Sequence, residues 1–193
     1  MKYSKLNMDE VKERIANTFV QLLETISYSK ITVKLICEAT PISRNGFYYH
    51  FEGKEDLVKW IVIQHFLKYS LPYFKFREDH IGAKSFFSYI YERKEFYNAI
   101  YKADNGELLR KCLIEAYRIG MEPNYVVEYS RVVKKDSFRV NTRICAAYVN
   151  SAIVGVILYW IEDGMRIPIK ELAKNMDLLL TKSMEDIRDY HLY

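Results

Sequence analysis

Glycine and proline are scarce in this sequence: seven Gly and four Pro occur among 193 residues. Folds built from short strands need more of both, because tight turns depend on positive φ angles and on the preset φ of proline. Their scarcity argues against an all-β fold and favours helices. Half of the residues are hydrophobic and 28% are charged, which is typical of a globular protein with a sizeable core.

Cysteine is scarce as well. Cys37, Cys112 and Cys145 are far apart, odd in number, and form no Cys-x-x-Cys pair or Cys/His spacing suited to zinc. We therefore expect three buried thiols in a reducing cytoplasm rather than a disulfide framework. The four histidines show no metal-ligand spacing either. The sequence predicts no metal and no cofactor.

Motifs of catalysis and of membrane insertion are also missing. The chain has no glycine-rich phosphate loop, no His-Glu-x-x-His and no triad-like grouping around a cysteine, so we do not expect an enzyme. The longest apolar run, residues 145–161, contains Asn150 and Ser151 and is too short for a membrane span. The charged N-terminus lacks the apolar stretch of a signal peptide. The formal net charge of +4 permits nucleic-acid binding but does not argue for it.

Helical periodicity runs through the chain. Apolar residues recur at helical spacing from Val11 to Ile26, after a capping pattern at Asn7 and Glu10. Thr32 and Ser43 are suited to cap two short helices, the first ended by Thr40-Pro41, and a fourth helix begins near Gly53. After a connection at 74–82, further helices are predicted over 83–103, 105–120, 123–135, 139–163 and 168–188. The sequence thus predicts an all-α protein with a small bundle at 1–70 and a larger one at 71–193.

The short helix predicted at 43–51 is rich in aromatic residues. At about 100° per residue, Phe47 and Phe51 share one face, while the opposite face carries Arg44, Asn45, Tyr48 and Tyr49. Arg can bond guanine, Asn can pair with adenine, and a Tyr ring can lie on a thymine methyl group. Gly46 leaves one flank of the helix bare for close approach of a partner. Spacing alone leaves two readings equally open, a DNA-reading helix and a capped core helix with incidental polar residues.

Residues 32–57, TVKLICEATPISRNGFYYHFEGKEDL, resemble the helix-turn-helix signature of TetR-type (TetR/AcrR) bacterial transcriptional regulators. The matching positions are Ser43, Phe47, Tyr48, His50, Phe51, Lys54 and Leu57. The resemblance implies that the DNA backbone is held by Thr32, Ser43, Tyr48, His50 and Lys54, and that Arg44, Asn45 and Tyr49 face base edges. Two departures stand out, since Thr40-Pro41 replaces the usual Ala-Gly and Gly46 stands where a Thr often contacts phosphate.

The resemblance also implies a homodimer on palindromic double-stranded DNA. Ala147, Ser151 and Gly155 form a stripe of small residues at a spacing of four, which would let a second helix approach closely. We therefore predict a dimer interface made of Ala147, Ser151, Gly155, Leu172, Met176 and Leu179. In a monomer, the same helix would be the central core element.

A small-molecule effector in the C-terminal region is the last implication of the resemblance. The candidate residues for its pocket are Tyr89, Tyr97, Tyr101, Tyr117, Tyr148 and Asn150. The alternative is that these side chains only pack at the rim of the core and contact no ligand. The C-terminal layout is also similar to the subgroup around dihydroxyacetone-kinase regulators, some of which activate. Repression is the default that the family implies. The alternatives are an activator or adaptor of the same fold, or a helical ligand-binding protein that does not bind DNA.

Overall fold

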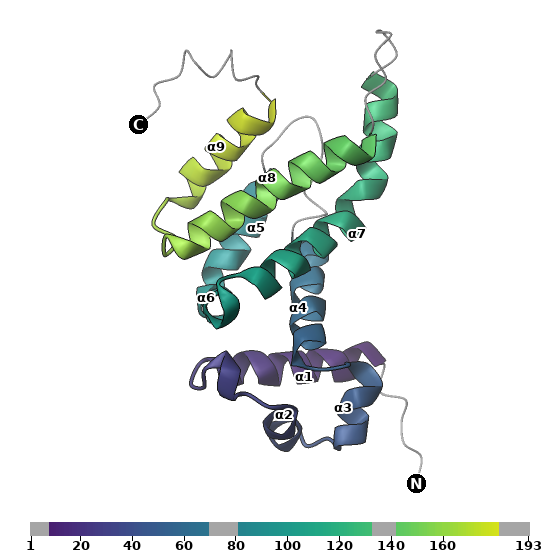
Figure 1. The fold of residues 1–193 in the computed structure, drawn as a ribbon, viewed down its shortest axis with the longest axis vertical. Helices are drawn as coiled ribbons and strands as arrows, with labels where there is room; N and C mark the ends of the chain where they lie inside the picture. Colours follow the sequence, from purple (N-terminus) through teal and green to yellow (C-terminus); the bar gives the residue numbers. More distant parts are fainter. Residues whose placement is uncertain (1–7, 70–80, 133–141, 182–193) are drawn as a thin grey trace.

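The computed structural model describes residues 8–69, 81–132 and 142–181, and every regular element in these ranges is helical (Figure 1). A small N-terminal unit, called here the reading head, contains α1 (Met8–Leu23), the 3-10 helix η1 (Tyr28–Lys30), α2 (Val33–Ala39) and α3 (Arg44–His50). The all-α prediction is confirmed. Asn7, predicted to cap α1, lies outside the described residues.

Helix α4 (Lys54–Tyr69) leaves the reading head and packs along α7 (Figure 1). This packing joins the head to the C-terminal bundle. The bundle contains α5 (Ile81–Glu92), α6 (Lys94–Asp104), α7 (Glu107–Val132), α8 (Thr142–Glu162) and α9 (Ile169–Thr181). Helix α8 lies across α7, and α9 packs on α5. Because α4 packs against both units, the division of the chain at residue 70 stays a prediction.

Two predicted helix boundaries are wrong. The helix expected at 83–103 is split at Arg93, where the chain makes a tight turn closed by the Arg93 amide on the Ile90 carbonyl at 3.1 Å. The helices expected at 105–120 and 123–135 form one helix, α7, which continues through Pro123. The turn before α7 uses left-handed backbone at Asn105 and Gly106, with φ of 55° and 82°. The Gly106 amide donates to the Tyr101 carbonyl at 2.8 Å and closes α6.

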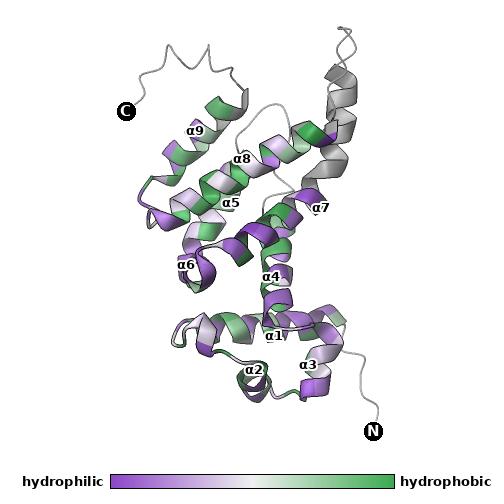
Figure 2. Ribbon diagram, viewed as in Figure 1, coloured by the Kyte–Doolittle hydropathy of each residue, from purple (hydrophilic) through white to green (hydrophobic). Residues whose placement is uncertain are grey.

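One continuous core joins the two units. Phe19 and Phe47 anchor it in the reading head, Phe66 continues it along α4, and Trp160 of α8 packs against Phe87 of α5 in the bundle. The indole N–H of Trp160 donates to the Ile167 carbonyl at 2.9 Å, so this ring is buried without losing a hydrogen bond. Figure 2 shows that α8 is largely hydrophobic along its length, whereas the reading head carries more hydrophilic positions.

The predicted burial of the thiols is confirmed for Cys37 and Cys112, the two cysteines whose side chains the structure describes. Burial raises the pKa of Cys112 to about 12, so this thiol stays protonated at neutral pH. The side chain of Cys145 lies outside the described part. Among the described residues, no helix has the length and hydropathy that a membrane span requires, and no group of three potential metal ligands occurs.

Candidate nucleic-acid interface

Two hydroxyl caps define the helix pair at the base of the reading head. Thr32 Oγ1 accepts a hydrogen bond from the Leu35 amide at 3.2 Å, and Ser43 Oγ accepts one from the Gly46 amide at 3.0 Å. Each cap satisfies an amide that the first turn of a helix leaves without a backbone partner. Both predicted caps are therefore present. Thr32 and Ser43 are both exposed.

Two phenylalanines attach α3 to the rest of the head. Phe47 and Phe51 are buried, with ring centroids 5.8 Å apart. Phe51 also meets the Trp60 ring of α4 edge-to-face at 5.9 Å. Burying aromatic side chains contributes several kcal/mol in total, at about 25 cal/mol for each Å² of apolar surface. The orientation of α3 is therefore set by its packing against α4, as the face assignment from the sequence predicted.

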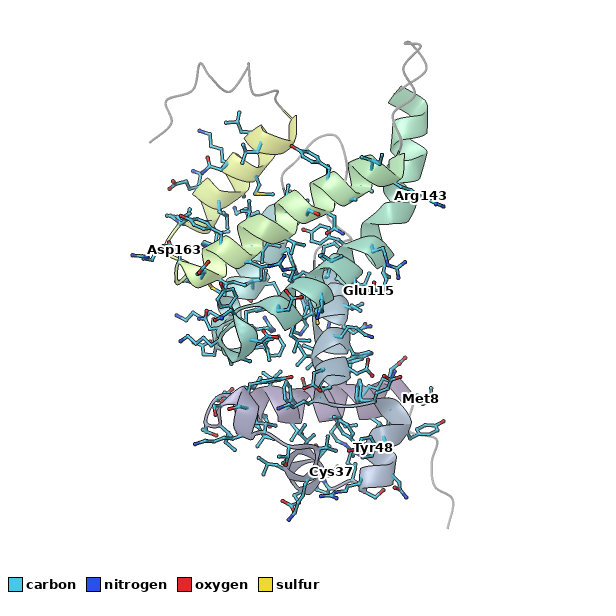
Figure 3. All side chains as sticks on the ribbon, in the orientation of Figure 1. Met8, Cys37, Tyr48, Glu115, Arg143 and Asp163 are labelled. Atoms are coloured by element: carbon cyan, nitrogen blue, oxygen red, sulfur yellow. The ribbon has the colours of Figure 1, made fainter. Side chains whose placement is uncertain are left out.

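The opposite face of α3 is open to solvent. Arg44 and Asn45 are exposed, and Tyr48 and Tyr49 keep 55% and 74% of their surface accessible. Figure 3 marks Tyr48 on α3 and Cys37 on α2 at the end of the molecule farthest from the bundle. Helix α3, RNGFYYH, carries no carboxylate. This face thus offers hydrogen-bond donors and aromatic surface without negative charge to repel phosphate.

His50 stands at the end of the exposed face, against the Tyr49 ring at 5.0 Å. Partial burial, followed by the positive charge of Lys12, lowers the pKa of His50 below its ordinary value. The imidazole is therefore neutral near pH 7 and has one N–H to donate. The Lys12 ammonium lies 5.6 Å from the Phe51 ring centre, so it reaches the same edge of the head. Lys12 is not predictable from local sequence, because only tertiary packing brings α1 beside the end of α3.

Lys54 is held by the protein itself. Its ammonium donates to the carbonyls of Tyr28 and Ile31 at 3.1 and 3.2 Å, and lies 4.1 Å from the centre of the Tyr28 ring. Two of its three N–H donors are thus used to close η1, which leaves one for a phosphate. The contact predicted for Lys54 stays a prediction. Replacing this lysine would weaken the attachment of η1 to α4 as well as any DNA contact.

The two departures from the family pattern lie at the start of α3 and in the turn before it. The Ile42 amide donates to the Cys37 carbonyl at 3.2 Å, a bond typical of the Schellman ending of a helix, here α2. This ending requires left-handed backbone at the position before Ile42. Pro41 occupies that position, and its φ is 30°. At Gly46, a Cβ atom would lie 3.3 Å from Ser43 Oγ. Glycine at this position therefore leaves room for the capping hydroxyl.

A short helix that exposes Arg, Asn and Tyr, mounted by its aromatic side on two supporting helices, is the arrangement of a helix-turn-helix DNA reader. Comparisons with known protein families agree with this assignment of a helix-turn-helix. A model described as bacterial regulatory proteins of the tetR family matches residues 19–61, and one described as a transcriptional regulator C-terminal region matches residues 80–182. The chain therefore belongs to the TetR family of DNA-binding transcriptional regulators, which is not a family of enzymes. No curated protein matches the sequence.

Solved structures with the same fold are distant in sequence. The dihydroxyacetone kinase operon activator DhaS superposes with a TM-score of 0.58 at 20% identity, over 94% of this chain and 98% of its own. The fatty acid degradation regulator FadR from Bacillus halodurans gives 0.61 at 17% identity, over 95% and 99%. The TetR family repressor AlkX from Dietzia sp. gives 0.55 at 16% identity, over 86% and 94%. At these identities, the similarity shows a shared fold.

The six residues predicted for the dimer interface divide into two groups. Leu172 and Met176 are buried within the single chain, on the side of α9 that packs against α5, so they offer no surface to a second copy. The other four are exposed: Ala147, Ser151, Gly155 and Leu179. A Cβ atom at Gly155 would meet nothing within 4 Å. Ile144, Tyr148 and Tyr159 extend this open face of α8.

The six residues predicted for one effector pocket are not brought together. Tyr97 and Tyr117 are buried in the core, and Tyr117 packs on Phe66 with centroids 4.4 Å apart. Tyr148 is 75% exposed on α8. The Asn150 amide donates to the Ile114 carbonyl at 3.2 Å. Tyr89 and Tyr101 line two different cavities. Local spacing does not encode which faces of different helices meet around a common space.

Proposed function

We propose that this regulator binds a palindromic operator as a homodimer, with α3 of each copy in successive major grooves, and that its default action is repression. The exposed face of α3 carries this proposal, because it presents Arg44, Asn45 and Tyr49 without any carboxylate on the helix. Arg44 and Asn45 suit guanine and adenine edges, and Tyr49 suits a thymine methyl group. Around them, Thr32, Ser43, Tyr48, His50 and the remaining donor of Lys54 would hold phosphates.

Pairing of two chains would place two reading helices on one face of the DNA. One short helix reads few base pairs, so a dimer is needed to reach the affinity of a specific regulator. The half-sites would then lie about 34–36 Å apart, or a multiple of that distance, because successive major grooves face the same side at one helical turn. The exposed stripe on α8 and the exposed Leu179 of α9 support a dimer through these two helices.

Arg44 provides the test of base reading. After selection of bound sites from genomic DNA, Arg44→Ala should weaken binding to the selected site by about 1–3 kcal/mol and leave random duplex nearly unchanged. Lys34→Ala, which removes another exposed cation of the head, should lower both affinities about equally. Both variants are compared by electrophoretic shift at one salt concentration. Equal losses on both duplexes for Arg44→Ala would show that Arg44 does not read bases.

Activation is the second candidate. The solved structure of DhaS carries the name of an operon activator, although its 20% identity to this chain shows the fold alone. The position of the selected site, together with reporter expression, distinguishes repression from activation. A site that overlaps a promoter, with increased reporter expression when the regulator is deleted, indicates repression, and decreased expression indicates activation.

A further inference from the structure

A cavity of about 250 Å³ lies where the reading head meets the bundle. Glu13 and Asn17 of α1, Trp60 and His65 of α4 and Phe96 of α6 share its wall. Helix α1 lies across the lower end of α4 and also contacts α6 (Figure 1). A ligand in this cavity would therefore touch the head, the helix that carries the head, and the bundle at the same time.

One wall of the cavity is aromatic. The rings of Tyr69 and Tyr89 are stacked, with centroids 4.0 Å apart and planes 20° from parallel. The Arg93 guanidinium lies 3.9 Å from the centre of the Tyr89 ring, on the same wall. Trp60 and Phe96 supply further ring surface. Such a wall favours a planar, unsaturated body, because stacked and edge-to-face rings attract one another beyond the effect of buried area.

The charges on the wall favour an anion. Arg93 and Lys68 both line the cavity, against the single carboxylate of Glu13. Arg93 also forms an exposed ion pair with Glu92, in which Nη1 and Oε2 are 3.5 Å apart. His65 adds no charge, because burial, with the fields of Arg93 and Lys68, lowers its pKa to about 3. A guanidinium offers paired N–H donors that match the two oxygens of a carboxylate.

We propose that this junction cavity binds a small aromatic carboxylate, with its ring against the Tyr69–Tyr89 wall and its carboxylate held by Arg93 and Lys68. The volume of about 250 Å³ suits a single-ring molecule, because sites for drug-sized ligands span about 300–1,000 Å³. The inference rests on the proposed function, since such a ligand would regulate DNA binding. A molecule that contacts both α1 and the bundle binds best to one arrangement of the head, and so shifts the population toward it.

Benzoate and benzamide form the probe pair, because they differ mainly in the charge of the polar group. Titration calorimetry on the full chain should give benzoate at least about tenfold tighter binding than benzamide, the difference that a charge-assisted hydrogen bond supplies. Equal affinities for the two probes, or no binding of benzoate at millimolar concentration, would overturn the proposal.

Charge-neutralising variants locate the site. Arg93→Gln and Lys68→Gln should each weaken benzoate binding by about tenfold and leave benzamide within about twofold. Glu13→Gln should have the opposite effect and tighten benzoate binding, because it removes a like charge from the wall. Lys102→Gln changes an exposed lysine of α6 outside the cavity and serves as the matched control. If Arg93→Gln disturbs folding, Glu13→Gln still decides, because unchanged or weaker benzoate binding would contradict the site.

The regulatory role has a separate readout. Benzoate should change operator affinity, and the operator should change benzoate affinity by the same factor, because coupling between two sites is reciprocal. Benzoate binding that leaves operator affinity unchanged would overturn the regulatory part. A protein that fails to select DNA without any ligand would overturn the proposed function instead, while calorimetry would still test the cavity.

Discussion

His65 lies where the reading head meets the bundle, and its surroundings keep its side chain neutral. His65 packs against Tyr89, with ring centroids 4.6 Å apart, and shares a hydrogen bond of 3.2 Å with the Tyr97 hydroxyl. Burial is the largest cause that lowers its pKa to about 3, and the nearby Arg93 and Lys68 act in the same direction. The sequence showed an isolated histidine, and only the fold placed two cations and three aromatic rings around it.

The lowered pKa of His65 predicts a loss of folding stability in mild acid. The unfolded chain takes up the proton near its ordinary pKa of about 6.5, whereas the folded state does so only near pH 3, so stability falls as the pH drops below about 6.5. Between about pH 7.5 and 5.5, the loss from this group should be about 1.4 kcal/mol in urea unfolding. His65→Gln keeps a polar side chain but does not titrate, so it should remove this part of the pH slope. An unchanged slope in the variant would contradict the assignment.

Helices α2 and α3 show how local signals and packing combine at the scale of elements. Thr32 and Ser43 set where the two helices begin, and their side chains alone predicted this correctly. The turn between the helices is different, because Pro41 stands in left-handed backbone that the pyrrolidine ring disfavours. Proline also has no N–H to complete the second bond of the Schellman ending. This turn is therefore the strained point of the reading head.

Replacement of Pro41 tests that strain. Pro41→Gly should raise the free energy of unfolding by about 1 kcal/mol, because relief of backbone strain exceeds the added freedom of the unfolded chain. Pro168→Gly is the matched control: Pro168 precedes α9 and has no positive φ, so the same change should lower stability by up to about 1 kcal/mol. Urea unfolding measures both variants. Destabilisation by Pro41→Gly would show that the ring suits this turn.

The open face of α8 is a property of the whole molecule. Ile144, Tyr148 and Tyr159 are large apolar side chains that the chain leaves exposed along one helix, with Ser151 and Gly155 between them. Exposed apolar surface of this kind is typical of a protein interface. Burial of Leu172 and Met176 within the chain narrows the predicted contact to this face and to Leu179. A second copy docked here would orient both reading heads.

Light scattering tests the pairing. The wild-type chain should show a mass of about 46 kDa, twice 23.0 kDa, at micromolar concentration. Gly155→Gln should shift the mass toward that of one chain, because the new side chain has free space in the monomer but blocks a closely packed helix. Ala103→Gln places the same side chain at an exposed position of α6 and should leave the mass unchanged. A mass near 23 kDa for the wild type would exclude the dimer.

Local sequence was sufficient to predict the helical class, the caps at Thr32 and Ser43, and the division of α3 into an anchored and an exposed face. These features depend on residues within a few positions of each other, so periodicity and capping chemistry are enough to predict them. Tertiary packing accounts for the engagement of Lys54 by η1, for the position of Lys12 near His50, and for which tyrosines share a cavity. It also continued α7 through Pro123, against the local preference of proline. Each of these outcomes depends on contacts between segments far apart in the chain, which local spacing does not encode.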